Sequence, residues 1–164
     1  MLLVFCFLII FSILWTEENK TKFIANLSVT TGIFSGIKIS FGNANITDNR
    51  SSETTINYKA DLEVTFKPQM HGENSLHNIY LQWNRFYNPY RTKSFLILKG
   101  GVFWLEMGDW FGGSDKKSTF TLPIISIGYG YSFKLNEESF IRPSMDLGIQ
   151  GNIINIELSY FFNL

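Results

Sequence analysis

Apolar and polar residues alternate along most of the chain after residue 20. Successive side chains of a β-strand point to opposite faces of the sheet, so this period of two predicts strands with one apolar and one polar face. The clearest run is 56–67, where Ile56, Tyr58, Ala60, Leu62, Val64 and Phe66 alternate with Asn57, Lys59, Asp61, Glu63, Thr65 and Lys67. Similar runs cover 27–41, 79–84, 125–134, 141–150 and 153–162.

A further run, 94–107, is apolar on both faces and contains Gly100-Gly101, a glycine pair that predicts a bulge or a kink. Turn-rich stretches separate the runs at 42–53, 68–75, 88–93, 108–118, 135–138 and 151–152. No helical pattern and no linker interrupts the series. We therefore expect residues 17–164 to form a single all-β domain.

The chain begins with an apolar segment, residues 1–15, broken only by Ser12. It is shorter than the roughly 20 residues that a helix needs to span a bilayer, but it has the length of the apolar part of a signal peptide. We predict that residues 1–16 are a signal-peptide-like export segment, although no Lys or Arg precedes the run and no Ala-x-Ala-like site follows it. A short membrane anchor or a buried helix is the alternative.

Alternation fits two kinds of barrel. A soluble barrel points its apolar face inward, whereas a transmembrane barrel turns it toward lipid. Here the apolar face carries large residues, while the polar face is often Gly or Ser, as in Gly128-x-Gly130-x-Ser132. The interior of an eight-stranded barrel is narrow, so small residues and a few charges fit inside it and large residues would overfill it. The two faces therefore favour an apolar exterior.

Aromatic residues near the ends of two predicted strands favour the same orientation. Tyr129, Tyr131 and Phe133 end one apolar face, and Tyr160 and Phe162 end another. Amphipathic rings gather at the membrane–water interface, where they form girdles around a barrel. We expect these residues to be membrane-interface aromatics. Packing in a core or in cross-strand pairs is the alternative.

The last run alternates to the end of the sequence, through Ile154, Ile156, Leu158, Tyr160, Phe162 and Leu164. In this feature the chain resembles bacterial outer-membrane β-barrel proteins, above all the small eight-stranded type, whose last strand typically ends in an aromatic residue. This chain departs from that pattern, because it ends in Leu164 and Phe162 stands two positions earlier. The resemblance implies a monomeric, antiparallel, up-and-down transmembrane β-barrel in the bacterial outer membrane. It also implies contact with membrane lipid and recognition of the C-terminal strand by the outer-membrane assembly machinery.

The pattern shows seven runs, whereas single-chain bacterial barrels have an even number of strands. We therefore expect eight strands, one of them hidden. Segment 22–41 is long for a transmembrane strand of about 9–11 residues and could turn near Thr30-Thr31-Gly32. Alternatively, 94–107 could fold at its glycine pair, or a strand could lie near 84–91.

Composition narrows the class of protein. Aromatic residues make up 16% of the chain and charged residues 17%, with a formal net charge of zero. A balanced charge argues against a nucleic-acid-binding protein, and an aromatic-rich chain with little charge argues against disorder. Cys6 is the single cysteine, and no Cys/His cluster has zinc spacing. We expect no disulfide within the chain, no metal and no cofactor.

Charged residues on the polar face would point into such a barrel. They are Lys38, Lys59, Asp61, Glu63, Arg142, Asp146 and Glu157. Burying an unpaired charge is costly, so we predict that opposite charges pair and plug the lumen. A narrow conducting channel lined by the same residues is the alternative.

The two histidines, His71 and His77, flank a polar turn, but members of a catalytic triad normally come from separated elements. We therefore expect no enzymatic activity and no catalytic residue. A structural, adhesion or surface-interaction role is expected, with residues 109–117 forming either a recognition loop or a solvated hairpin loop. The alternatives are a secreted or periplasmic lipocalin-like barrel that binds a small apolar ligand, and a barrel enzyme that acts on lipid or peptide.

Overall fold

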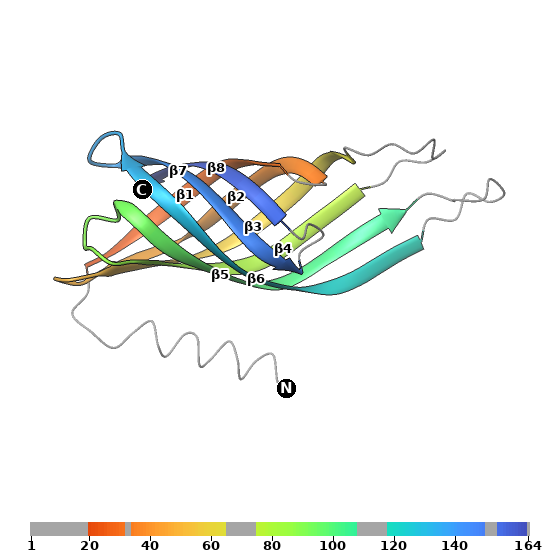
Figure 1. Ribbon diagram of the computed structural model, residues 1–164, viewed down its shortest axis with the longest axis horizontal. Coiled ribbons are helices and arrows are strands. Elements are labelled where there is room, and N and C mark those ends of the chain that lie inside the picture. The colour runs from red at the N-terminus through yellow and green to blue at the C-terminus, as the bar shows by residue number, and fades with distance from the viewer. Residues whose placement is uncertain (1–19, 32–33, 65–74, 108–117, 150–153, 164) are drawn as a thin grey trace, which may run out of the picture.

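The protein is a closed barrel of antiparallel strands (Figure 1). The computed structural model describes residues 20–31, 34–64, 75–107, 118–149 and 154–163, so the expected export segment lies outside the described residues. Within them the strands are β1 Lys20–Thr31, β2 Phe34–Ile46, β3 Ser51–Val64, β4 Ser75–Phe86, β5 Lys93–Met107, β6 Ser118–Lys134, β7 Ser139–Ile149 and β8 Ile154–Asn163. Each strand pairs with its neighbours in chain order, and β8 pairs with β1. The predicted eight-stranded, up-and-down, all-β fold is confirmed.

The eighth strand arises because segment 22–41 contains two strands, which was the first of the three predicted possibilities. β1 ends at Thr31 and β2 begins at Phe34, so the predicted turn near Thr30-Thr31-Gly32 is confirmed. The register pairs Val29 with Ile37, so odd-numbered residues stay on one face through the hairpin. The alternation of apolar and polar residues therefore continues through the turn, and the sequence shows the two strands as one run. The other two options are wrong, because 94–107 lies in the single strand β5 and 84–91 contains only the end of β4 and a turn.

Several strands are longer than their sequence runs. β2 and β3 reduce the predicted turn stretch 42–53 to residues 47–50, and β6 includes residues 118–124. Backbone hydrogen bonds to a neighbouring strand extend these strands through Gly, Asn and Thr residues, although such segments show no alternation of apolar and polar side chains. The bulge predicted at Gly100-Gly101 is absent, since the register of β5 with both neighbours passes through this pair without a shift.

The barrel has two unlike ends. At one end, named the turn end here, β2–β3, β4–β5 and β6–β7 are joined by residues 47–50, 87–92 and 135–138, beside the start of β1 and the end of β8. At the opposite end, named the loop end, β5 and β6 reach beyond the other described strands (Figure 1). β6 pairs with β5 from Ser118 onward, but its pairing with β7 begins only at Ile125.

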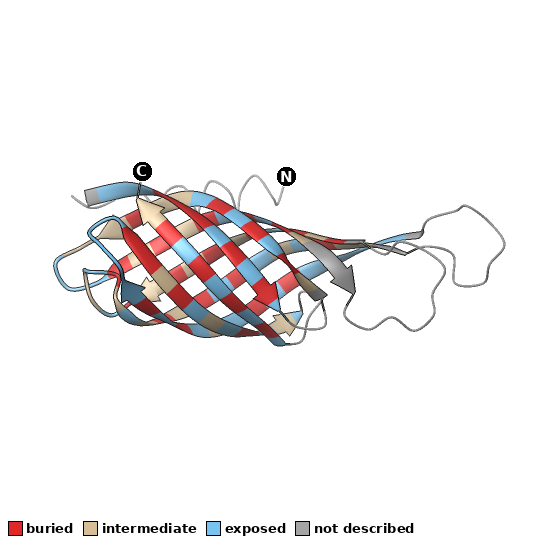
Figure 2. Cartoon of the chain, turned by 90° about the horizontal axis from the view of Figure 1, so that it is seen from above, coloured by how far each residue is buried: buried red, intermediate tan, exposed pale blue. Residues whose placement is uncertain are grey.

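Burial alternates along the strands and gives the barrel wall a chequered pattern (Figure 2). Lys38 and Arg142 are 0% exposed, whereas Ile56, Ile127 and Leu158 are 55–58% exposed. Charged residues such as these two thus lie inside the barrel, and many large aliphatic residues lie on its exterior. This is the inverted orientation that the composition of the two faces favoured.

Candidate functional site

The lumen at the turn end is filled by an arginine surrounded by phenylalanines. We name this group the turn-end plug; it consists of Glu53, Phe86, Arg91, Phe95, Phe140, Arg142 and Phe161. The Arg142 guanidinium donates to both carboxylate oxygens of Glu53, at 2.5 and 2.9 Å, in the bidentate geometry that arginine forms with carboxylates. Its Cζ lies 3.9 Å from the ring centroid of Phe161 and 4.8 Å from that of Phe86.

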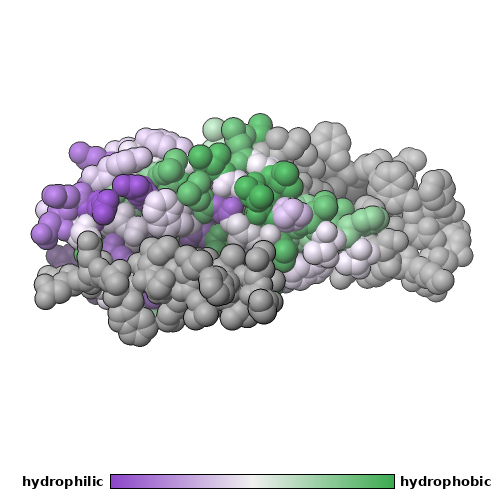
Figure 3. All heavy atoms as spheres, turned by 90° about the horizontal axis from the view of Figure 1, so that it is seen from below, coloured by the Kyte–Doolittle hydropathy of each residue, from purple (hydrophilic) through white to green (hydrophobic). Residues whose placement is uncertain are grey.

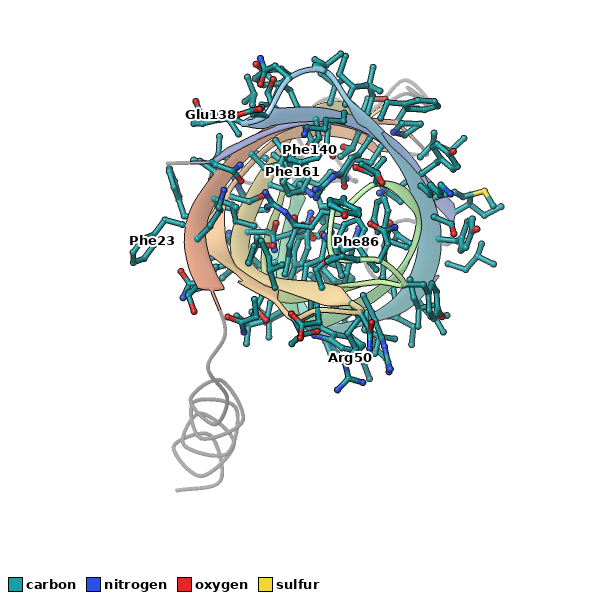
Figure 4. The ribbon with its side chains drawn as sticks, turned by 90° about the vertical axis from the view of Figure 1, so that its left-hand side faces the viewer. Phe23, Arg50, Phe86, Glu138, Phe140 and Phe161 are labelled. Atoms are coloured by element: carbon teal, nitrogen blue, oxygen red, sulfur yellow. The ribbon has the colours of Figure 1, made fainter. Side chains whose placement is uncertain are left out.

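Rings on several sides of this cation add cation–π attraction to the ion pair. Phe140 and Phe95 contribute at 5.0 and 5.7 Å from Arg142 Cζ. Figure 4, which looks into the turn end, shows Phe86, Phe140 and Phe161 inside the ring of strands and Phe23, Arg50 and Glu138 outside it. The phenylalanine rings of the plug therefore form an apolar cage around the buried Arg142–Glu53 ion pair.

Arg91 joins the plug from the turn between β4 and β5. Its backbone has φ 55°, in the left-handed region. Its Nη1 lies 3.1 Å from Glu53 Oε1, its Nη2 donates to Asn163 Oδ1, and its Cζ lies 4.9 Å from the Phe140 ring centroid. Burial lowers the pKa of the Arg91 guanidinium, and the Glu53 carboxylate opposes that shift. The turn, β3 and the end of β8 are thus tied together across the lumen.

The middle of the lumen holds a second charged group, the central network of Lys38, Lys99, Asp146 and Glu157. Lys38 forms an ion pair with Glu157. Lys99 Nζ lies 2.6 Å from Asp146 Oδ2 and 3.8 Å from Glu157 Oε2, so it connects the two carboxylates. Asn155 donates to Asp146 at 3.2 Å. All four charged side chains are buried and face oppositely charged partners, which is the arrangement that burial of charge requires.

Amide side chains join the central network to the plug. Lys38 donates to Gln82 Oε1 at 3.4 Å, Gln82 donates to Asn84 Oδ1 at 2.9 Å, and Asn84 donates to Glu53 at 3.3 Å. Polar networks of this kind favour one arrangement of the interior, because each partner satisfies another buried group. The two charged layers of the lumen therefore form one connected structure.

An apolar cluster closes the lumen on the loop side of the central network. Its buried members are Leu76, Tyr80, Phe103 and Ile124, and Leu105 packs against them. Lys99 Nζ lies 5.4 Å from the Tyr80 ring centroid, so the cluster rests directly on the network. Along the barrel axis the described interior thus changes from aromatic plug to ion pairs to apolar cluster.

Lumen-facing glycines make room for these side chains. A Cβ on Gly130 would lie 2.3 Å from Phe95 Cζ, and one on Gly128 would lie 2.4 Å from Asp146 Cβ. Both distances are far below van der Waals contact. The glycines that distinguish the polar face in the sequence therefore leave the space that Phe95 and Asp146 occupy.

The structure places the charged residues expected in the lumen as follows. Arg142 lies in the turn-end plug, and Lys38, Asp146 and Glu157 lie together in the central network. Lys59 is also buried. The side chains of Asp61 and Glu63 lie outside the described residues.

Three charged residues of the lumen were missed by the sequence reasoning. Glu53 continues the polar parity of Asn57 and Lys59 and could have been found by extending that run backward. Lys99 stands in a run that is apolar on both faces, which concealed its inward direction. Arg91 lies in a turn, where a strand period carries no information about direction.

The expected interface aromatics lie on the exterior near the turn end. Tyr129, Tyr131, Phe133 and Tyr160 are exposed, and Phe162 is half-buried. The rings of Tyr131 and Phe133 lie 4.7 Å apart, and those of Tyr160 and Phe162 lie 6.1 Å apart. Figure 3 shows hydrophobic side chains across the middle of one face and hydrophilic ones at its turn end.

His77 also lies on the exterior, in a stack of rings toward the loop end. Its ring centroid lies 6.1 Å from that of Tyr58 and 5.4 Å from that of Trp104, and its Nδ1 hydrogen-bonds the Tyr58 hydroxyl at 3.0 Å. His71 lies outside the described residues. In the described part of the chain, no cluster of three or more His, Cys, Asp or Glu side chains could hold a metal ion. The same part holds no helix that is long and apolar enough to cross a bilayer.

Comparison with known proteins identifies the fold. No protein-family model matches the sequence, and no curated protein matches it. The structure is similar to the N-terminal β-barrel domain of Pseudomonas aeruginosa OprF, with a TM-score of 0.59 and 16% sequence identity over 90% of this chain and 100% of that one. Neisserial surface protein A (NspA) gives a TM-score of 0.57 and 12% identity over 90% of this chain and 100% of its own.

A third similar structure is Ail, the attachment invasion locus protein of Yersinia pestis. It gives a TM-score of 0.53 at 8% identity, and the match covers 90% of this chain and 98% of that one. At these identities the likeness concerns the fold. The chain has the fold of the small eight-stranded outer-membrane barrels.

Proposed function

We propose that this chain is a small, monomeric β-barrel of the bacterial outer membrane with a structural, adhesion or surface-interaction role. The observation that carries the proposal is the inverted barrel, in which Lys38, Arg142 and Glu157 are buried while Ile127 and Leu158 are more than half exposed. Soluble monomers rarely expose large contiguous apolar patches. A belt of large aliphatic residues around a barrel with a charged interior is the surface that a bilayer covers.

The strand lengths agree with this location. The described strands have 10 to 17 residues, and about 9–11 tilted residues are enough to cross the hydrocarbon core. We place Tyr129, Tyr131, Phe133, Tyr160 and Phe162 at the membrane interface on the turn-end side, because they end the apolar exterior next to the turns.

The proposal includes an orientation and a route of assembly. In bacterial outer-membrane barrels the short turns and both termini of the barrel chain face the periplasm. We therefore assign the turn end to the periplasm and the loop end to the outside. The alternating apolar residues of β8, ending in Tyr160 and Phe162, form the segment that we propose the assembly machinery recognises. Membrane lipid is the second proposed partner.

The lumen is proposed to be closed to ions. The turn-end plug, the central network and the apolar cluster follow one another along the barrel axis. Large side chains are fully buried in the plug, as Arg142 and Phe86 are, and in the apolar cluster, as Leu76 is. A planar-bilayer recording should therefore show no steady current. A stable, ohmic current from the purified barrel would contradict this point and favour the narrow-channel alternative.

A surface role is supported at a coarse level by two proteins of the same fold. One is named a surface protein of Neisseria and the other the attachment invasion locus protein of Yersinia pestis. The proposal assigns no catalytic residue, and His77 is assigned to the ring stack on the exterior. Turnover of a lipid or peptide that is lost when His77 or His71 is replaced by alanine would overturn this part of the proposal.

The test of the membrane location is the solubility of the folded chain. We expect refolding to require detergent micelles or lipid vesicles, and folded and boiled samples to migrate differently on a denaturing gel. Recovery of a folded monomer in buffer without detergent would refute the membrane location and favour the lipocalin-like alternative. That alternative requires an apolar cavity, whereas the middle of the described lumen contains the ion-paired side chains of Lys38, Lys99, Asp146 and Glu157.

A further inference from the structure

The hairpin of β5 and β6 extends past the rim of the barrel and leaves one strand edge open. β6 pairs with β5 from Ser118, opposite Met107, through Ile124, opposite Gly101. On its other side, pairing with β7 begins at Ile125. Among the described residues, 118–124 therefore have no strand along the β7 side. Figure 2 shows the barrel narrowing at this end, where the hairpin extends.

The position of Pro123 indicates which backbone groups lie on this edge. Residues of an antiparallel strand direct their N–H and C=O groups alternately to one neighbour and to the other. Proline has no N–H and is accommodated where that group would point away from the paired strand. We infer that Thr119 and Thr121, which share the parity of Pro123, direct their N–H groups to the open edge, whereas Phe120 and Leu122 bond to β5.

One face of the same segment is apolar. Phe120 lies opposite Leu105, and Leu122 lies opposite Phe103. Phe120 and Leu122 are 51% and 50% exposed, yet they share the parity of Ile124, which is buried in the apolar cluster at the mouth of the lumen. The exposed apolar face of the hairpin is thus continuous with the interior of the barrel.

The edge lacks most of the features that protect exposed strands. Natural edges are usually blunted by charged side chains, proline or bulges, because unpaired backbone groups beside apolar residues recruit other strands. Residues 118–124 contain no charged residue, and Pro123 lies at the barrel end of the edge. The outer part, with Thr119, Phe120 and Thr121, combines strand-favouring residues with an open edge.

From this combination we propose that the edge of β6 at residues 118–124 binds an extended segment of another polypeptide, which adds a strand to the hairpin and places alternate apolar side chains on Phe120 and Leu122. Water can satisfy the backbone groups but does not cover the apolar side chains, and lipid chains cover apolar side chains but accept no hydrogen bonds. An extended apolar-alternating peptide does both, as in other examples of strand addition.

A second copy of the chain fits this edge less well. Copies in one membrane share their orientation, so a two-fold axis between them runs along the membrane normal. After that rotation, Phe120 and Leu122 of one copy lie on one side of the joined sheet and those of the other copy lie on the opposite side. The two apolar faces therefore do not become continuous. The proposal rests on the proposed membrane location in assigning this edge to the cell exterior and in disfavouring a second copy.

Amide hydrogen exchange of the full chain, refolded in detergent micelles and read residue by residue by NMR, tests the proposal. Without a partner, the amides of Thr119 and Thr121 should exchange much faster than those of Phe120 and Leu122. The probe is an octapeptide of alternating valine and threonine, capped at both ends. Its addition should slow exchange at Thr119 and Thr121 at least about tenfold, the value for a hydrogen bond of about 1.4 kcal/mol.

Matched controls separate edge pairing from unspecific contact. The same octapeptide with every amide N-methylated should protect neither threonine. The double variant Phe120→Ser/Leu122→Ser should lose the protection, whereas Thr119→Ser/Thr121→Ser should keep it, because that variant retains the backbone donors and the apolar face. Equal protection of all four amides before the octapeptide is added would overturn the proposal, as would protection by the methylated peptide or no response to the unmethylated one.

Two further readouts complete the test. Protection that rises with protein concentration alone would show that a second copy occupies the edge and would overturn the choice of partner. Gel migration of folded and boiled samples reports barrel folding separately for each variant. If the chain proves to be a soluble barrel, the proposed membrane location fails while the exchange experiment still decides whether the edge binds a strand.

Discussion

Replacing Glu53 by glutamine would leave the two guanidinium groups of the turn-end plug without a counterion. Glu53 is fully buried and accepts two hydrogen bonds from Arg142, one from Arg91 at 3.1 Å and one from Asn84 at 3.3 Å. Glutamine keeps the shape of the side chain and one oxygen but removes the negative charge. The change therefore isolates the ionic part of the plug.

The magnitude follows from the burial of the pair. Breaking one side of a buried ion pair costs about 3–5 kcal/mol, because the remaining charge stays in a poorly solvating site. The rings around Arg142 contact it before and after the change, so their cation–π attraction does not alter this cost. We therefore expect Glu53→Gln to lower the free energy of unfolding by roughly 3–5 kcal/mol.

The assay is urea unfolding of the barrel in phospholipid vesicles, followed by tryptophan fluorescence. A lower midpoint at unchanged denaturant slope would report a loss of stability. Glu137→Gln is the matched control, because Glu137 is exposed in the β6–β7 turn, and it should shift the free energy by no more than about 0.5 kcal/mol. In an Arg142→Met background, Glu53→Gln should cost about 2 kcal/mol less, since residues in contact couple.

Two results would refute this reasoning. One is a loss below about 1 kcal/mol, which is the ordinary cost of a point mutation and would mean that Glu53 does not hold the plug. The other is an equal loss with and without Arg142, which would show that the contact between them carries no coupling.

Two further changes test the interior and the exterior separately. Gly130→Ala should destabilise the barrel by about 1–3 kcal/mol, because the new Cβ would lie 2.3 Å from Phe95 Cζ, whereas Gly100→Ala, with no atom within 4 Å of its Cβ, should be neutral in the same unfolding assay. If both alanine variants are equally stable, the plug is not tightly packed at Phe95. Ile127→Lys should cost about 2–4 kcal/mol in vesicles and Tyr131→Lys at most about 1 kcal/mol, since the cost of a charge on a lipid-facing strand falls from the bilayer midplane to the interface. Equal costs at the two positions would contradict the placement of Tyr131 at the interface.

Much of the fold could be predicted because strand direction is a local property. The period of two in β3, β6 and β8 indicated which residues face inward before any pairing was known. The hairpin of β1 and β2 shows the limit of this information. Val29 pairs with Ile37, which keeps the parity through the turn and hides it from a search for periodicity.

The site was less predictable than the fold, for a physical reason that Lys99 illustrates. Its strand carries apolar residues on both faces, since the inward side is occupied by rings such as Phe95 and Phe103 at two levels and by the Lys99 ammonium between them. A sequence period cannot separate an apolar residue that faces outward from one that fills a plug. The position of each residue along the barrel axis is known only once the barrel is closed, and this position decides which inward side chains it contacts.

The sequence by itself determined that residues such as Lys38 and Arg142 lie on one face and Ile127 and Leu158 on the other, because neighbouring side chains of a strand necessarily point in opposite directions. Which inward residues meet was decided by the tertiary structure alone. Glu53 pairs with Arg142 across 89 positions of sequence. Closure of the sheet between β1 and β8 and the stagger of the strands bring these two side chains to one level, and no local pattern contains that stagger.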